Sequence, residues 1–252
     1  MRWGVLSDIH GNWEALDTAL KRLRTEGAQK YIFCGDLIGY GPDPEKCVQT
    51  FCRLKDAGKA LGVLGNHDAI FNHPELREYF NLEALHSLDW SAKQMTPASL
   101  RCIAFLPEVI QEKNFEVVHG SPLDPIKEYF ASARQYRSVY NLWKGQVLFV
   151  GHTHLPFYMQ GDENACHIEV VRTPLGLSLA PMLRYVINPG SVGKPRDNDT
   201  RASFGLWDDK ENTFYFLREE YDFTQTQDKM RAAGMDDFLI DLSLIHISEP
   251  TR

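Results

Sequence analysis

The first quarter of the chain alternates between short apolar runs and segments with apolar residues at helical spacing. Residues 3–6, 30–34 and 61–64 are short apolar runs, which are typical of buried strands. Residues 13–26 and 44–57 carry apolar side chains at helical spacing, and a glycine follows each segment. The order strand, helix, strand, helix, strand predicts a parallel sheet with right-handed crossovers. Ligand-binding loops of such a sheet follow the carboxyl ends of its strands.

The remainder of the chain changes from a helical to a β pattern. Residues 74–105 are mostly helical in pattern, with Thr96 and Pro97 as a predicted helix start. Short strand-like runs follow, separated by Gly, Pro, Asn and Asp: residues 115–118, 146–150, 157–160, 168–171, 183–187, 203–207 and 213–217. They predict a second, mainly antiparallel sheet packed on the first, and a helix over 223–233 closes the fold. We therefore expect an α/β protein.

Domain organisation follows from the same pattern. No linker divides the chain, and a length of 252 residues suits one large α/β domain, which we place at residues 1–240. Residues 241–252, DLSLIHISEPTR, do not extend the last helix and resemble a translated sequencing adapter. We expect them to be a non-native or disordered tail and leave them out of the interpretation.

Composition and charge exclude several classes of protein. Hydrophobic residues make up 43% and charged residues 24% of the chain, which are ordinary proportions for a folded globular protein. Lys and Arg total 27 against 34 Asp and Glu, so a net charge of −7 argues against stable nucleic-acid binding. No apolar run is long enough to span a bilayer, and residues 1–10 lack the features of a signal peptide. We expect a cytoplasmic protein.

The five cysteines are odd in number and scattered, and no pair has the spacing C-x-x-C. This pattern indicates neither a disulfide framework nor a zinc ribbon. We expect all five to be free thiols, either buried or half-buried, in a reducing compartment. They are Cys34, Cys47, Cys52, Cys102 and Cys166.

Candidate metal ligands are concentrated in five loops, four of which directly follow a predicted strand. The loops are residues 7–12 (SDIHGN), 35–36 (GD), 65–68 (GNHD), 119–120 (HG) and 151–154 (GHTH). Five of the nine histidines lie in them. One histidine alone is usually a surface or core residue, but carboxylate, imidazole and carboxamide groups at the ends of successive strands indicate a metal site.

The spacing within these loops agrees with metal binding. Asp8 and His10 are two residues apart, so in an extended segment both side chains leave the same side and can bind one ion. His152 and His154 have the same relation, but in a tight loop they can instead serve two neighbouring ions. This mixed oxygen and nitrogen set suits Mn, Fe, Zn, Co or Ni, and the absence of thiolate from the loops argues against a structural zinc.

These five blocks, in this order, resemble the calcineurin-like metallophosphoesterases. The resemblance covers residues 3 to about 218 and implies a four-layer α/β/β/α sandwich of two mixed sheets. Residues 35–42 (GDLIGYGP) and 188–196 (NPGSVGKPR) are similar to the small prokaryotic branch that contains phosphodiesterases and diadenosine-tetraphosphatase-like proteins. Protein Ser/Thr phosphatases of the family carry G-D-x-V-D-R-G and GNHE. Here the sequence reads GDLIGYG and GNHD, without the phosphate-binding arginine.

The resemblance implies two divalent metal ions as cofactors. Manganese is the preferred candidate, with Fe, Zn, Ni, Co or Mg as alternatives. One metal would be held by Asp8, His10, Asp36 and His154, and the other by Asp36, Asn66, His119 and His152. Asp36 would bridge both. The family reaction is hydrolysis of a phosphomonoester or phosphodiester by in-line attack of a hydroxide shared between the metals.

Further side chains are candidates for contact with the substrate. By resemblance, His67 faces the substrate and donates a proton to the leaving group, which contributes on the order of 10²–10⁴-fold to the rate. Asp68 would orient His67 or hold a turn. Asn12 could donate to a phosphoryl oxygen, cap the helix that begins at residue 13, or do both. Arg196, with Lys194, lies in a glycine-rich segment that is either a phosphate-binding loop or a turn between strands.

The expected partner is a small phosphate ester or a nucleotide. Monoesters, diesters, cyclic nucleotides and dinucleoside polyphosphates present the same phosphoryl group, so the motifs alone do not select among them. Two other functions compete with a small-molecule phosphoesterase. A catalytically weak scaffold that binds a protein partner is disfavoured because every ligand is present. A metal-dependent nuclease is disfavoured by the net charge of −7. The sequence makes no prediction of oligomeric state.

Overall fold

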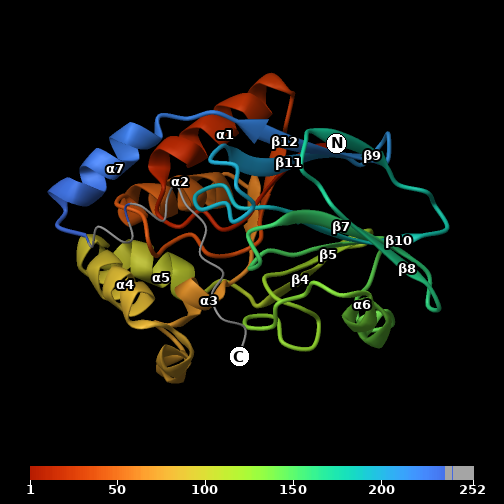
Figure 1. The fold of residues 1–252 in the computed structure, drawn as a ribbon, viewed down its shortest axis with the longest axis horizontal. Coiled ribbons are helices and arrows are strands. Elements are labelled where there is room, and N and C mark those ends of the chain that lie inside the picture. Colours follow the sequence, from red (N-terminus) through yellow and green to blue (C-terminus); the bar gives the residue numbers. More distant parts are fainter. Residues whose placement is uncertain (236–239, 241–252) are drawn as a thin grey trace.

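The computed structural model describes residues 1–235 and residue 240, in which two sheets are flanked by helices (Figure 1). The first sheet has the strand order β3-β2-β1-β11-β12-β9. Its strands are β1 (Arg2–Leu6), β2 (Lys30–Phe33), β3 (Ala60–Gly62), β9 (Leu175–Ser178), β11 (Ala202–Asp208) and β12 (Thr213–Glu219). Strands β1, β2 and β3 are parallel, which confirms the prediction from the first 64 residues.

The second sheet has the strand order β4-β5-β6-β10-β7-β8. Its strands are β4 (Val109–Gln111), β5 (Phe115–Val118), β6 (Val147–Phe149), β7 (Pro156–Gly161), β8 (Cys166–Val170) and β10 (Arg184–Pro189). Strands β5, β6 and β10 are parallel to one another, whereas the outer pairs are antiparallel. The sheet is therefore mixed.

The expectation that the later strands form a second sheet is wrong for β11 and β12, which join the first sheet, and β9 was not predicted as a strand. Strand β11 pairs antiparallel with β1, with Trp207 opposite Trp3, and β12 and β9 continue the first sheet from there. Every residue of β11 is buried, so its sequence carries no alternation that would show which sheet it enters.

Helices cover the outer face of each sheet and complete the four-layer α/β/β/α arrangement (Figure 1). They are α1 (Trp13–Thr25), α2 (Pro44–Asp56), α3 (Asn66–Ala69), the 3₁₀ helix η1 (Pro74–Tyr79), α4 (Leu82–Gln94), α5 (Pro97–Ala104), α6 (Ala133–Val139) and α7 (Phe223–Ala232). Helix α1 packs on β11 and β12 of the first sheet, and α6 packs on β8 of the second. Among the described residues, no helix combines the length and the apolar character needed to cross a membrane.

The core between the two sheets is aromatic and aliphatic. Phe149 of the second sheet packs against Trp207 and Phe214 of the first, with ring centroids 5.4 and 5.9 Å apart. All three side chains are buried. Burial of large apolar side chains between the sheets holds them face to face, so loops from both sheets can meet at one end. The predicted tail, residues 241–252, lies outside the described residues.

The prediction of five free thiols is wrong for two cysteines. Cys52 of α2 and Cys102 of α5 form a disulfide, with their Cα atoms 6.6 Å apart. They are 50 residues apart in the sequence and meet because α2 packs against α5, a contact that cysteine spacing does not reveal. Cys34, Cys47 and Cys166 are free, as expected.

Candidate active site

The predicted ligand loops follow strands of both sheets and meet at one place. Asp8 lies two residues after β1, Asp36 three residues after β2, and His119 directly after β5. Asn66 begins α3 after β3, and the loop with His152 follows β6. Because the first three strands and the pair β5 and β6 are each parallel, their carboxyl ends lie at the same edge of their sheet. The structure thus brings together residues from the whole first two thirds of the chain.

The backbone at these loops is unusual. Five predicted ligands have left-handed backbone conformation, with φ between 49° and 67°: Asp8, His10, Asp36, His152 and His154. Left-handed conformation is uncommon for residues with a Cβ and persists only when the surroundings enforce it. Here backbone hydrogen bonds between loops enforce it, because Asp8 N donates to Gly35 O at 3.1 Å and His10 N donates to Asp36 O at 3.0 Å.

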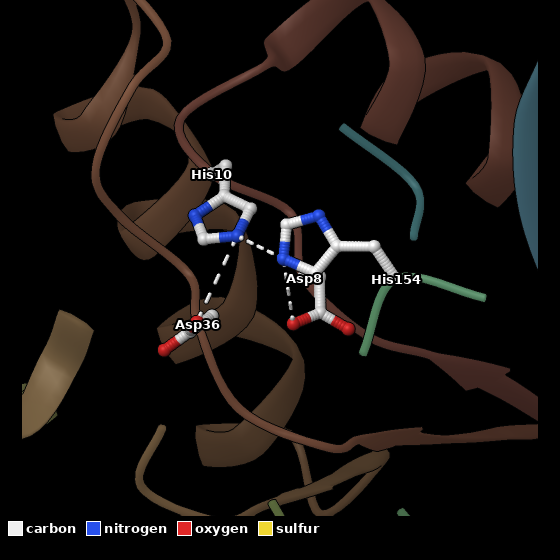
Figure 2. Close-up of side chains that lie close together, drawn as sticks. All are labelled: Asp8, His10, Asp36 and His154. Atoms are coloured by element: carbon white, nitrogen blue, oxygen red, sulfur yellow. Dashed lines mark hydrogen bonds and ion pairs between the residues drawn. The ribbon is translucent and has the colours of Figure 1, made fainter. Parts of the chain in front are cut away.

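The first group of candidate ligands is Asp8, His10, Asp36 and His154 (Figure 2). One ligand atom from each lies within 4.8 Å of the others, and all four side chains are buried. Nε2 of His154 is 3.5 Å from Asp8 Oδ1, and Nε2 of His10 is 3.7 Å from Asp36 Oδ2. The four residues therefore surround one small volume.

The two histidines of this group show that the volume suits a cation. Nδ1 of His10 donates to Ile38 O at 3.0 Å, and Nδ1 of His154 donates to Lys194 O at 2.6 Å. Burial lowers the pKa of both imidazoles well below the ordinary value, so each carries a single proton, which lies on Nδ1. Their two Nε2 lone pairs then face each other at 3.0 Å. Two facing acceptors favour a metal ion between them.

The second group is Asp36, His119 and His152, which also lie within 4.8 Å of one another. Nε2 of His119 is 3.3 Å from Asp36 Oδ2 and 3.0 Å from Asn66 Oδ1, so Asn66 joins this group. Nδ1 of His119 donates to Cys34 O, and Nε2 of His152 donates to Lys127 O, which leaves Nδ1 of His152 for a ligand. Asp36 is common to both groups.

The charges of the site are arranged as a cation would require. Burial raises the pKa of Asp8 to about 7, and its Oδ2 is buried without a hydrogen-bond partner in the described part of the chain. Burial opposes ionisation of Asp36 too, but His119, His67 and His10 hold its pKa below the usual range. Burial also lowers the pKa of His119, yet Asp36 and Asp8 outweigh it and raise that pKa to about 9. Positive charge is thus favoured between the carboxylates.

His67 lies beside both groups and is held by other rings. Its backbone N–H donates to Asp36 Oδ1 at 2.9 Å, and its side chain is 3% exposed. Its ring centroid is 4.7 Å from that of His10, 4.8 Å from Tyr40 and 4.9 Å from Phe80. Gly39 fits against the imidazole, since a Cβ there would lie 2.4 Å from Nδ1. The ring is therefore fixed next to the candidate ligands.

Asp68 and Asn12 make hydrogen bonds that hold neighbouring loops of the site together. The Asp68 carboxylate accepts from the backbone N–H groups of Leu37, Ile38 and Gly65 at 3.0 to 3.3 Å, which ties together the loops of Asp36 and His67. These bonds support the turn-holding alternative, and orientation of His67 by Asp68 stays a prediction.

Asn12 caps α1 by accepting from Ala15 N, and its amide donates to Gly193 O and to the Tyr221 hydroxyl. These bonds support the capping alternative, and contact of Asn12 with the substrate stays a prediction.

The segment around Arg196 lies against the first ligand loop. Gly193 N donates to Asp8 O at 3.0 Å, and a Cβ at Gly193 would lie 1.9 Å from Ile9 O, so only glycine fits this approach. Arg196 N donates to His154 O at 3.4 Å. Besides burial, the charge of Arg196 lowers the pKa values of His152 and His154. The structure therefore places Arg196 next to the candidate metal ligands, and binding of the substrate by Arg196 stays a prediction.

Three aromatic side chains next to the site were not predicted from the sequence. Tyr129 stacks on His152 with ring centroids 3.9 Å apart, and Phe80 packs on His67. Tyr40 lies beside His10 with a centroid distance of 4.9 Å. The only available signal was for Tyr40, which stands between two glycines in the loop after Asp36. Nothing in the spacing of Phe80 or Tyr129 distinguishes them from core aromatics.

Comparisons with known proteins agree with this site. The sequence profile of the calcineurin-like phosphoesterase family matches residues 1–178. The chain is 33% identical over 230 residues to the uncharacterized protein MJ0912 of Methanocaldococcus jannaschii, with 90% of each chain covered. It is 24% identical over 216 residues to phosphodiesterase YfcE of Escherichia coli, with 82% of this chain and 88% of the relative covered.

Solved structures show the same fold over nearly the full length. The crystal structure of a metallophosphoesterase from Sphaerobacter thermophilus superposes with a TM-score of 0.83 at 32% sequence identity, covering 96% of this chain and 98% of that one. The chain belongs to the calcineurin-like phosphoesterase family and is a metal-dependent hydrolase of phosphoric esters.

Proposed function

We propose that the protein hydrolyses small phosphate esters or nucleotides with two divalent metal ions, with manganese as the preferred metal. The observation that carries the proposal is the pair of buried ligand groups that share Asp36. A shared carboxylate with two oxygens is the arrangement that two neighbouring cations require. The family membership and the 24% identity to a protein named as a phosphodiesterase support phosphoesters as substrates.

We assign Asp8, His10, Asp36 and His154 to one metal, and Asp36, Asn66, His119 and His152 to the other. The donor set fits, because it combines carboxylate oxygens, an amide oxygen and imidazole nitrogens; Nε2 of His119 would lose its proton when a metal binds. When bound, two such ions supply Lewis-acid activation of water and charge stabilisation of the phosphoryl group. The protein positions these ligands before any metal enters, through hydrogen bonds from backbone groups and to carbonyl oxygens.

His67 is proposed as the general acid. The Nδ1 edge of its ring packs on Gly39, so we assign Nε2 as the atom that gives its proton to the leaving oxygen. Its backbone bond to Asp36 fixes it to the shared ligand, and three neighbouring rings restrict its rotation. No Ser or Cys nucleophile is needed. Arg196, next to His154, is proposed to bind the phosphoryl group of the substrate.

The proposal is tested with protein reconstituted with Mn²⁺ after its native metal content has been measured. We expect turnover of bis-p-nitrophenyl phosphate, p-nitrophenyl phosphate or both, and loss of turnover with a chelator. A panel of monoesters, diesters, cyclic nucleotides and dinucleoside polyphosphates then ranks the substrates by kcat/KM. Absence of turnover of every ester at full metal occupancy contradicts the proposal. Degradation of DNA in preference to small esters would indicate the nuclease instead.

A further inference from the structure

Lys194 is outside the proposed ligand set, but its backbone is fixed to two of the ligand loops. Its N–H donates to Ser191 Oγ at 2.8 Å, and the same hydroxyl donates to Asp8 O at 2.8 Å. Its carbonyl accepts from His154 Nδ1 at 2.6 Å. The side chain of Lys194 therefore starts from a point that is fixed relative to Asp8 and His154.

The ammonium of Lys194 is held on an aromatic ring. Its Nζ lies 3.2 Å from the ring centroid of Tyr40, which is cation–π geometry. The same ring is 4.9 Å from His10 and 4.8 Å from His67 by centroid distance. Tyr40 is buried, and its backbone N–H donates to Ser87 Oγ of α4 at 3.1 Å. One fixed ring thus contacts a proposed ligand, the proposed acid and a lysine.

The charge balance indicates what this ammonium faces. Asp8 and Asp36 supply at most two negative charges to the proposed ligand set, against the four positive charges of two divalent cations. An ammonium and a guanidinium beside such a centre increase its positive charge and favour an anionic ligand there. A phosphoryl group supplies that anion, and its oxygens accept hydrogen bonds from an ammonium.

We propose that Lys194 binds a phosphoryl oxygen of the substrate, and that Tyr40 is the positioning residue that holds its ammonium for this contact. The inference rests on the proposed function and deepens it. It assigns a second cation, besides Arg196, to recognition of the phosphoryl group. The ring of Tyr40 would then position both Lys194 and the proposed acid His67.

Binding of inorganic phosphate to the manganese-loaded protein tests this inference by isothermal titration calorimetry. Lys194→Met removes the charge and keeps the length of the side chain, and we expect its Kd for phosphate to rise about tenfold or more. Tyr40→Leu should raise the Kd by a smaller factor, and Tyr40→Phe, which keeps the ring, should restore it. Lys30→Met is the matched control, because Lys30 also lies over an aromatic ring, that of Trp3 at 5.4 Å, at the opposite end of β2.

Phosphate binding by the wild type and the variants is compared at equal manganese content, measured by elemental analysis. Thermal unfolding shows whether each variant is folded. An unchanged phosphate Kd in Lys194→Met overturns the inference, including when that variant has a lower Tm, since a purely structural lysine would behave in this way. Equal Kd values for Tyr40→Leu and Tyr40→Phe overturn the part assigned to Tyr40. If the wild type binds phosphate through Lys194 but hydrolyses no ester, the inference stands and the proposed function fails.

Discussion

Gly65→Ala perturbs the shared carboxylate without changing any ligand. A Cβ at position 65 would lie 2.1 Å from Asp36 Oδ1 and 2.3 Å from Asp36 N, whereas ordinary van der Waals contact begins at 3.4 Å. Asp36 or the loop of residue 65 must therefore move by more than about 1 Å, and a displacement of that size can lower the rate by about 100-fold. Overpacking also destabilises by about 1–3 kcal/mol.

The measurement combines kcat/KM for bis-p-nitrophenyl phosphate with the affinity for Mn²⁺ in calorimetric titrations. We expect both to fall for Gly65→Ala, and circular dichroism to show that the chain still folds. Gly176→Ala in β9 is the control, because the nearest atom to its new Cβ is 3.3 Å away on the exposed side chain of Tyr215. If Gly65→Ala binds two metal ions with wild-type affinity and reacts within twofold of the wild type, the shared role of Asp36 is refuted.

Three further predictions address the ligands, the acid and the metal. Asp36→Asn should remove nearly all activity and leave the fold intact, because asparagine tolerates the left-handed backbone at this position; unchanged activity and metal content would contradict the bridging assignment. His67→Ala should keep its metal and lose rate, most of all with alkoxide leaving groups; an equal loss for p-nitrophenolate, checked by kcat, would count against the acid. Mn²⁺ at 100 times its Kd should stabilise the fold by about 2.7 kcal/mol for each ion bound, seen as a higher Tm that a chelator reverses; an unchanged Tm would argue that the site binds no metal.

The sequence predicted the site better than it predicted the sheets. Ligands such as Asp36 and His119 lie within three residues of the end of a short apolar strand, so their position depends only on local pattern and on the geometry of parallel strands. Sheet membership of β11 was not predictable, because a fully buried strand carries no alternation, and its pairing with β1 joins residues about 200 apart.

Contacts between elements that are far apart in the sequence were likewise not predictable from sequence patterns. The bond between Cys52 and Cys102 requires α2 and α5 to lie together. The hydrogen bonds of the Asp68 carboxylate could not be predicted either, because the N–H groups of Leu37 and Ile38 that it accepts from belong to a loop about 30 residues earlier. Sequence patterns name the residue types at a site, whereas long-range packing decides which neighbours each one meets.

The left-handed backbone at five ligand positions lowers the local stability of these loops in the metal-free protein. Each such residue costs roughly 1 kcal/mol relative to an ordinary conformation, so together they cost on the order of 5 kcal/mol, comparable with the lower limit of the net stability of a domain. The aromatic core between the sheets has to hold this unfavourable geometry in place. In a metal-free sample, amide hydrogens of these loops should consequently exchange with solvent long before those of the central strands, so the catalytic end should unfold locally while the sheets stay intact.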